Sequence, residues 1–431
     1  PSWLNAGLAA RLPFALLLAL TMTTTWHAAY YLALSPQAQP VPFAFGGEAK
    51  PKDYARTIAD GALLALIACL GLALLSHEAS PILAQLALLS LVFYGVAVLP
   101  FHPRYSFIAL FVGLPGLCIS GAPSFALMIA IGCLFLNFIE HRQLTFATKF
   151  HSAIGLICCC FAIVFLATKL DLWRFRIVVP GTTWVEWRSQ IRLFAWFTWP
   201  AWPLVAWTLW RWRRQWTSAK WSRHLVLPMW FMGLPVITTI LTPSPQQTLL
   251  LSLPAMAALC AFALPTMRRS MSSLIDWFAL LFFSACATAI WVVWIAMQFG
   301  WPKTPASNVD RLAPEYIHNF SWLALIVAAT ATFAWCWLVA WRTSRHRSAM
   351  WKSMVLPAGG AALCWLLLMT LWLPLLNFML GYKAWADKLR AEIELQAGPV
   401  KENICILNHD LDVERAIAFS YHAKIKIEHL S

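Results

Sequence analysis

Two of the polar segments between the apolar runs, 169–192 and 300–320, combine basic with acidic side chains. Guanidinium and ammonium groups bind phosphate oxygens and neutralise a departing phosphate, which is the chemistry that a lipid-linked phosphate requires. The candidate phosphate ligands are Arg188, Arg192, Lys303 and Arg311. A neighbouring carboxylate serves as a general base or holds a divalent metal ion. The candidates for that role are Glu186 and Glu315.

The same residue types also have a plain structural interpretation. Arg and Lys side chains near a membrane surface extend toward the lipid headgroups, and charged loops are simply solvated. No spacing within either segment separates this interpretation from phosphate binding, so both stay open.

The amino-acid composition indicates what kind of structure surrounds these polar segments. Of the 431 residues, 60% are hydrophobic and 12% are charged, whereas soluble domains average about 45–50% apolar and about 25% charged residues. A water-soluble globule cannot bury that much apolar surface. The composition therefore excludes a soluble enzyme, a disordered tail, a solenoid or a coiled coil as the main architecture, and it predicts an all-α polytopic membrane protein.

The net charge of +14 agrees with that class. In a polytopic chain, Lys and Arg collect in the cytoplasmic loops, so a basic balance is no sign of a nucleic-acid partner. No soluble basic face is available to follow a phosphate backbone, and we expect membrane lipids rather than nucleic acid as partners.

About twelve stretches reach the roughly 20 apolar residues that a spanning helix needs. The stretches 105–119 and 122–139 are the weakest, and they form either two crossings or one broken re-entrant hairpin. The expected spans are 9–33, 61–76, 82–100, 105–119, 122–139, 151–168, 193–210, 225–241, 247–265, 274–299, 321–341 and 353–380.

Loop charge predicts the orientation of these spans. One set of alternate loops carries about twice as many Lys and Arg residues as the other, and the richer set belongs on the cytoplasmic side. The segments 169–192 and 300–320 and the C-terminal tail then face the outside. For a bacterial inner membrane, this is the periplasm.

Few ionisable residues fall in the middle of the spans, which disfavours a proton- or ion-coupled transporter. Two amides, Asn137 and Asn377, lie in apolar stretches. Hydrogen bonds between helices are their expected role.

Residues 1–380 are therefore expected to form the transmembrane helical domain. Residues 381–431 are expected to form a small C-terminal periplasmic α/β domain that is either tiny or cut short. In this tail, 403–408 reads as a strand, 413–419 as a helix and 424–428 as a second strand.

Three longer segments resemble one family. The segment 193–204 (LFAWFTWPAWPL), followed by Trp207 and the basic run 211–214, is similar to the corresponding segment of bacterial GT-C membrane glycosyltransferases of the aminoarabinose (lipid A) transferase type, family 39. The segments 42–60 and 365–374 resemble a subset of that family with long hydrophobic chains. The resemblance covers nearly the whole chain and implies a GT-C-like helical bundle.

The resemblance implies that a sugar, aminoarabinose-like or another hexose or pentose, is moved from a polyprenyl-phosphate donor to lipid A or a similar periplasmic acceptor. It also implies an acidic catalytic residue, in some members a divalent metal ion, and a C-terminal periplasmic domain. The sequence begins with Pro1 rather than Met, so an N-terminal truncation is expected, with the catalytic acid upstream of Pro1. The catalytic residue is then unknown for this chain.

One segment departs from the family pattern. A basic residue and a Tyr commonly precede a Leu-Pro pair in an external segment of the family, and 246–254 (QQTLLLSLP) has neither. Two other interpretations therefore remain: a non-catalytic scaffold with the same fold, or a transport protein for lipid-linked sugars such as a flippase or an O-antigen ligase-like protein.

Overall fold

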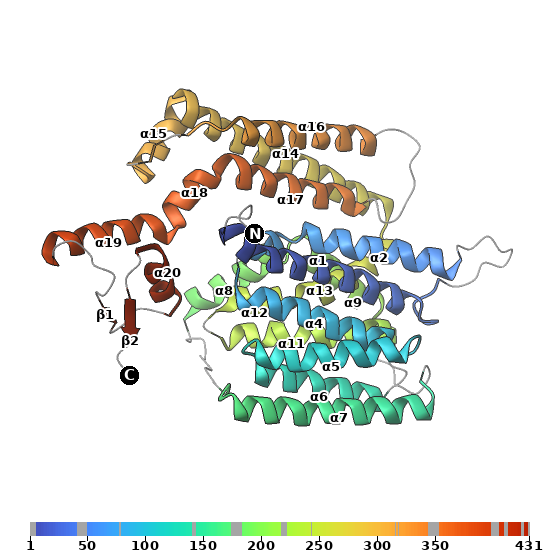
Figure 1. Ribbon diagram of the computed structural model, residues 1–431. Helices are drawn as coiled ribbons and strands as arrows, with labels where there is room; N and C mark the ends of the chain where they lie inside the picture. Colours follow the sequence, from blue (N-terminus) through green and yellow to red (C-terminus); the bar gives the residue numbers. More distant parts are fainter. Residues whose placement is uncertain are drawn as a thin grey trace. The chain divides into compact units, whose positions relative to one another are not determined.

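The computed structural model describes residues 6–40, 50–76, 79–139, 144–173, 183–216, 222–242, 244–314, 316–317, 319–343, 353–397, 405–408, 413–423 and 426–429. Nearly all of these residues lie in helices (Figure 1). The elements up to residue 266 are α1 (Ala6–Ala33), α2 (Pro51–Ala68), α3 (Leu70–Leu75), α4 (Pro81–Val98), α5 (Pro103–Ile119), α6 (Pro123–Ile139), α7 (Phe146–Lys169), α8 (Trp184–Phe197), α9 (Ala201–Arg211), α10 (Arg213–Trp216), α11 (Arg223–Ile240), α12 (Pro245–Leu250), α13 (Leu253–Ala261) and the 3₁₀ turn η1 (Leu264–Thr266).

The remaining elements include one π-helical turn between two α-helices. They are α14 (Arg269–Phe299), α15 (Lys303–Leu312), α16 (Trp322–Thr343), α17 (Val355–Leu367), η3 (Leu368–Trp372), α18 (Leu373–Leu380), α19 (Tyr382–Ala397), β1 (Cys405–Asn408), α20 (Val413–Ala423) and β2 (Lys426–His429).

Several helices begin at a proline, including α2, α4, α5 and α12. Proline suits the first position of a helix because its missing N–H would have no intrahelical partner there. These prolines explain why the apolar runs start as helices at those positions.

Within the described residues, eight helices are long and apolar enough to cross a membrane, so the chain is built as a multi-pass membrane protein. The expected number of twelve is too high. Two of the expected spans, 105–119 and 122–139, are apolar helices that fall short of the length of a full crossing, namely α5 and α6. Two others, 61–76 and 193–210, are each broken into two shorter helices.

The two breaks meet in space. Helix α2 ends before Cys69, whose backbone is extended, and the N–H of Leu70 donates to the carbonyl of Trp199 at 3.2 Å. Trp199 itself lies between α8 and α9. Gly71 packs so closely on the ring of Phe197 that a Cβ there would lie 2.2 Å from it. Hydropathy does not reveal such breaks, because irregular backbone is tolerated in a membrane protein wherever protein covers it.

The chain divides into two compact units. Unit 1 comprises residues 1–283 and 335–362, and unit 2 comprises residues 284–334 and 363–431. The large apolar core lies in unit 1, where α4 packs against α1 and α5 and is buried around most of its circumference. A helix that is apolar on all sides belongs in such an interior position.

The C-terminal tail contains the strand, helix and strand expected from its pattern, and β1 pairs in parallel with β2. A separate α/β domain is nevertheless not supported. Each strand has four residues, and the tail belongs to the same compact unit as residues 284–334. Two such strands bury too little apolar surface to form an independent core.

Candidate functional site

The first group of candidate residues lies on α8, in unit 1. Arg188 and Arg192 are four residues apart, so they share one face of the helix, and both side chains are exposed. Glu186 precedes Arg188 by two residues, which rotates it by about 200° to the other side of the helix. The structure therefore brings the two arginines together and separates Glu186 from them.

The second group lies on α15, in unit 2. Lys303 begins this helix and Arg311 lies in its last turn, and both side chains are exposed. Eight residues of helix correspond to about 12 Å, so the two cations are too far apart to hold the same phosphate oxygen. Glu315 lies outside the described residues. The arginines of α8 thus belong to unit 1, and the cations of α15 belong to unit 2.

A cavity of about 360 Å³ adjoins the end of α15. Sequence reasoning missed two of its residues, Trp385 and Lys388 on α19, because a polar, amphipathic helix in the tail reads as part of a soluble domain. Tyr316 follows the end of α15 by four residues, and its ring packs against that of Phe378 with centroids 5.5 Å apart. Burial raises the pKa of the Tyr316 phenol, so this group stays protonated at pH 7. The residues that line the cavity are Leu312, Ala313, Pro314, Phe378, Met379, Trp385 and Lys388.

A second cavity, of about 310 Å³, lies in unit 1 between α9, the start of α14 and Pro357 of α17. All the residues that line it are apolar or aromatic, and we refer to it as the tryptophan cavity. Hydrocarbon fits such a lining, because no polar group of the wall loses water when a chain enters. The lining residues are Trp199, Pro200, Pro203, Leu204, Trp207, Met267, Met271, Leu274, Ile275, Phe278, Ala279, Phe283 and Pro357.

Polar contacts hold the walls of the tryptophan cavity in place. Trp207 donates from its indole Nε1 to the hydroxyl of Thr266 at 3.1 Å. On α14, Asp276 accepts a 2.5 Å charge-assisted hydrogen bond from Arg342 of α16, and both side chains are largely buried. Sequence reasoning did not single out this pair, because the two residues are 66 positions apart. The available signal for the cavity was the Trp-Pro run at 199–203, which the sequence analysis used only for the family resemblance.

The acids were also candidates for a metal ligand set. Among the described residues, no group of three or more His, Cys, Asp or Glu side chains is placed to hold a metal ion. Glu186 stands exposed on α8. The described residues therefore do not form a metal site, and no chemical step is assigned to a metal here.

Comparisons with known proteins identify the architecture. No family model matches the chain, and no curated protein matches it. Two solved structures are similar: ArnT from Cupriavidus metallidurans bound to undecaprenyl phosphate, and the same protein in the apo state. The TM-score is 0.58 for both, the sequence identities are 12% and 13%, and the match covers 98% of this chain and 72% and 71% of those chains.

The likeness extends over almost all of the chain, so it concerns the arrangement of the helices as a whole rather than one hairpin. At this level of identity it establishes the fold and carries no residue roles. The chain therefore has the GT-C fold of the aminoarabinose transferase ArnT.

Proposed function

We propose that this chain is a membrane glycosyltransferase that takes a sugar from a polyprenyl-phosphate donor and transfers it to lipid A or a similar acceptor on the periplasmic side of a bacterial inner membrane. The observation that carries the proposal is the fold, which is shared with an ArnT structure that holds undecaprenyl phosphate. The tryptophan cavity supports it, since its apolar lining suits part of a prenyl chain.

In this reaction, the acceptor oxygen attacks the anomeric carbon of the sugar and the polyprenyl phosphate leaves with its bonding electrons. Negative charge then develops on the phosphate oxygens, and a cation placed beside them lowers the barrier. Arg188 and Arg192 present two guanidinium groups one helical turn apart, which suits a phosphate group. Lys303, Arg311 and Lys388 supply the corresponding charges in unit 2. The periplasmic location of the C-terminus and of these cations rests on the loop-charge count.

Photolabelling of the full chain in lipid nanodiscs tests the donor. The probe is a polyprenyl phosphate that carries a benzophenone on its chain, and labelled peptides are identified by mass spectrometry. We expect labels within 199–207 and 267–283, removed by excess undecaprenyl phosphate. Ala279 lines the cavity and is 1% exposed, so Ala279→Phe should reduce labelling at least fivefold.

The matched control is Ala289→Phe, which lies on the same helix at an exposed position. This variant should be labelled by the probe to the same extent as the unsubstituted chain. Equal labelling of both variants would contradict the assignment of the prenyl chain to this cavity.

A transfer assay then separates enzyme from non-enzyme. The chain is supplied with a polyprenyl-phosphate sugar and lipid A, and the glycosylated acceptor is detected by mass spectrometry. Labelling together with product formation supports the glycosyltransferase. Labelling without product, with the sugar donor intact, supports instead a non-catalytic or transport protein for lipid-linked sugars.

A further inference from the structure

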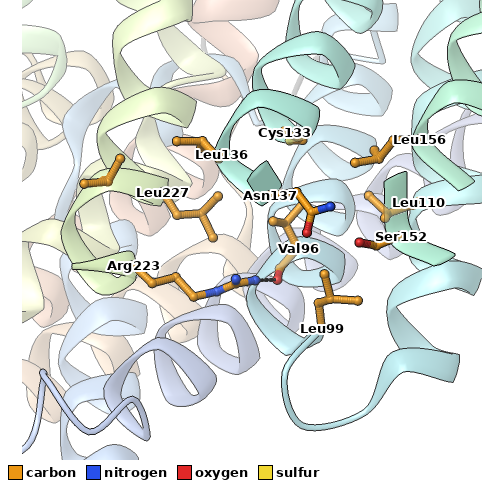
Figure 2. Close-up of a pocket in the computed structure, with 11 residues that line it drawn as sticks. Val96, Leu99, Leu110, Cys133, Leu136, Asn137, Ser152, Leu156, Arg223 and Leu227 are labelled. Atoms are coloured by element: carbon orange, nitrogen blue, oxygen red, sulfur yellow. Dashed lines mark hydrogen bonds between the residues drawn. The ribbon is translucent and has the colours of Figure 1, made fainter. Parts of the chain in front are cut away.

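A small pocket with three polar side chains in a largely apolar wall lies among five helices of unit 1, and we call it the Arg223 pocket (Figure 2). Helices α4 and α6 end nearby at Val98 and Ile139, and α11 begins there at Arg223. The enclosed space measures about 40 Å³. It shares no lining residue with the tryptophan cavity. Its lining residues are Val96, Leu99, Leu110, Cys133, Leu136, Asn137, Ser152, Leu156, Arg223, Val226 and Leu227.

Arg223 brings a permanent positive charge into this pocket. Its side chain is 9% exposed, and it donates through Nη2 to the carbonyl of Val96 in the last turn of α4. That contact adds a second donor at the C-terminal end of α4, where the same carbonyl also accepts from the N–H of Leu99 at 3.3 Å. A guanidinium carries five N–H donors on three nitrogens, so it serves a ligand and the carbonyl at the same time.

Asn137 supplies an acceptor that the described residues leave without a donor. Its side chain is 6% exposed, and Nδ2 donates to the carbonyl of Lys149 at 3.0 Å, which links α6 to α7 as the sequence predicted. Ser152 donates to the same carbonyl at 2.9 Å. The Oδ1 atom of Asn137 is buried and has no hydrogen-bond partner among the described residues. Leaving such an acceptor unsatisfied costs about 1–3 kcal/mol.

We propose that the Arg223 pocket binds the headgroup of a glycerophospholipid. The phosphate accepts from the guanidinium of Arg223, and a donor on the headgroup, the ammonium of ethanolamine or a hydroxyl of glycerol, satisfies Oδ1 of Asn137. The phosphate thus faces the positive charge of Arg223, and the donor of the headgroup meets the acceptor of Asn137 that the described residues leave unsatisfied.

The size and position of the pocket agree with this ligand. A space of about 40 Å³ holds about three water-sized groups, which fits the donor-bearing end of a headgroup with the phosphate at the mouth. The pocket lies at helix ends, where the polar layer of a bilayer is found. Apolar side chains such as Leu99 and Leu136 form the remaining wall, as the glycerol and upper acyl region of a lipid requires.

Lipid retention by the full chain tests the proposal. The chain is reconstituted in nanodiscs of phosphatidylethanolamine and phosphatidylglycerol, released into mild detergent and analysed by native mass spectrometry. We expect one phospholipid to stay bound per chain. Arg223→Met and Asn137→Leu should each reduce retention at least fivefold. The control Arg56→Met removes an exposed arginine elsewhere and should retain lipid normally.

A further variant separates a lost ligand from a misfolded chain. Asn137→Asp keeps the acceptor and adds a negative charge, so it should still retain phosphatidylethanolamine, whose ammonium it attracts, and lose phosphatidylglycerol at least fivefold. A change of lipid preference in this direction cannot come from general misfolding.

Inorganic phosphate is titrated in parallel to distinguish a free anion from a lipid. Weak binding of phosphate, with lipid retention unchanged by excess phosphate, supports the headgroup. Tight phosphate binding that displaces the lipid would assign the pocket to a free anion and overturn the proposal. So would equal lipid retention by the unsubstituted chain, Arg223→Met and Asn137→Leu. None of these outcomes depends on whether the chain transfers sugars.

Discussion

The tryptophan cavity and the Arg223 pocket are two hollows in the same unit with opposite chemistry. The first measures about 310 Å³ and presents apolar and aromatic side chains, whereas the second measures about 40 Å³ and has a guanidinium, an amide and a hydroxyl in its wall. An apolar wall selects by volume and shape, because the hydrophobic effect has no direction. A polar pocket selects by its hydrogen-bond pattern, since each unmatched group carries a penalty. Substitutions should therefore act differently in the two places.

The largest effect is expected at the ion pair beside the tryptophan cavity. Asp276→Ala leaves the largely buried Arg342 without its carboxylate, and breaking such a pair typically costs about 3–5 kcal/mol. The loss is measured as the decrease in the free energy of unfolding in mixed detergent. The double variant Asp276→Ala with Arg342→Ala should be less destabilised than Asp276→Ala alone. A loss below about 1 kcal/mol in the single variant would show that this cavity wall does not depend on the pair.

A smaller loss is expected from Gly132→Ala, next to the Arg223 pocket. A Cβ at Gly132 of α6 would lie 2.0 Å from the indole of Trp230 on α11. Overpacking of this kind costs about 1–3 kcal/mol, and it should also reduce phospholipid retention because α6 and α11 both line the pocket.

Gly233→Ala is the matched control for this change, since nothing lies within 4 Å of a Cβ there. It should be neutral or stabilising by up to about 1 kcal/mol, the ordinary advantage of Ala in a helix. Equal losses in both variants would point to a general intolerance of side chains rather than to the contact with Trp230.

Trp207→Phe probes whether the tryptophan cavity selects by shape alone. The change removes the hydrogen bond to Thr266 and should cost about 1 kcal/mol in the free energy of unfolding. Photolabelling by the prenyl phosphate should stay within about twofold, because an aromatic wall remains. A much greater loss of labelling would mean that the cavity recognises its ligand through a polar group.

The smallest effect on stability is expected for the double change Arg188→Ala and Arg192→Ala. Both side chains are exposed, so unfolding should shift by less than about 0.5 kcal/mol. Binding of undecaprenyl phosphate should weaken, whereas binding of the uncharged alcohol undecaprenol should not change. Undiminished binding of the phosphate would remove these arginines from the proposed site.

Hydropathy predicted the class of fold well, because long apolar runs have few alternatives in a membrane. It overestimated the number of spans for a physical reason. The runs 61–76 and 193–210 are apolar throughout, yet the backbone at Cys69 and Trp199 leaves the helix where the two runs contact each other. A hydropathy average over one segment of the chain cannot reveal a contact with a residue far away in the sequence.

In the candidate site, too, local features could be predicted from the sequence, whereas features that depend on tertiary packing could not. The pairing of Arg188 with Arg192 could be predicted, because two residues four positions apart share one face of a helix. Arg223 was not singled out from the sequence, although its side chain is buried against α4. Its position directly before an apolar run was the available signal. The partner of Asp276 was invisible, because it depends on how α14 and α16 pack.

The contact between the two helix breaks has a consequence for biogenesis. The N–H of Leu70 finds its acceptor only at Trp199, and the ribosome adds about 5–20 residues per second. The segment around Cys69 therefore waits on the order of ten seconds after its own synthesis for the partner that completes it. During that interval, the translocon or a membrane chaperone has to shelter an incomplete span, which makes this stretch a sensitive point for quality control.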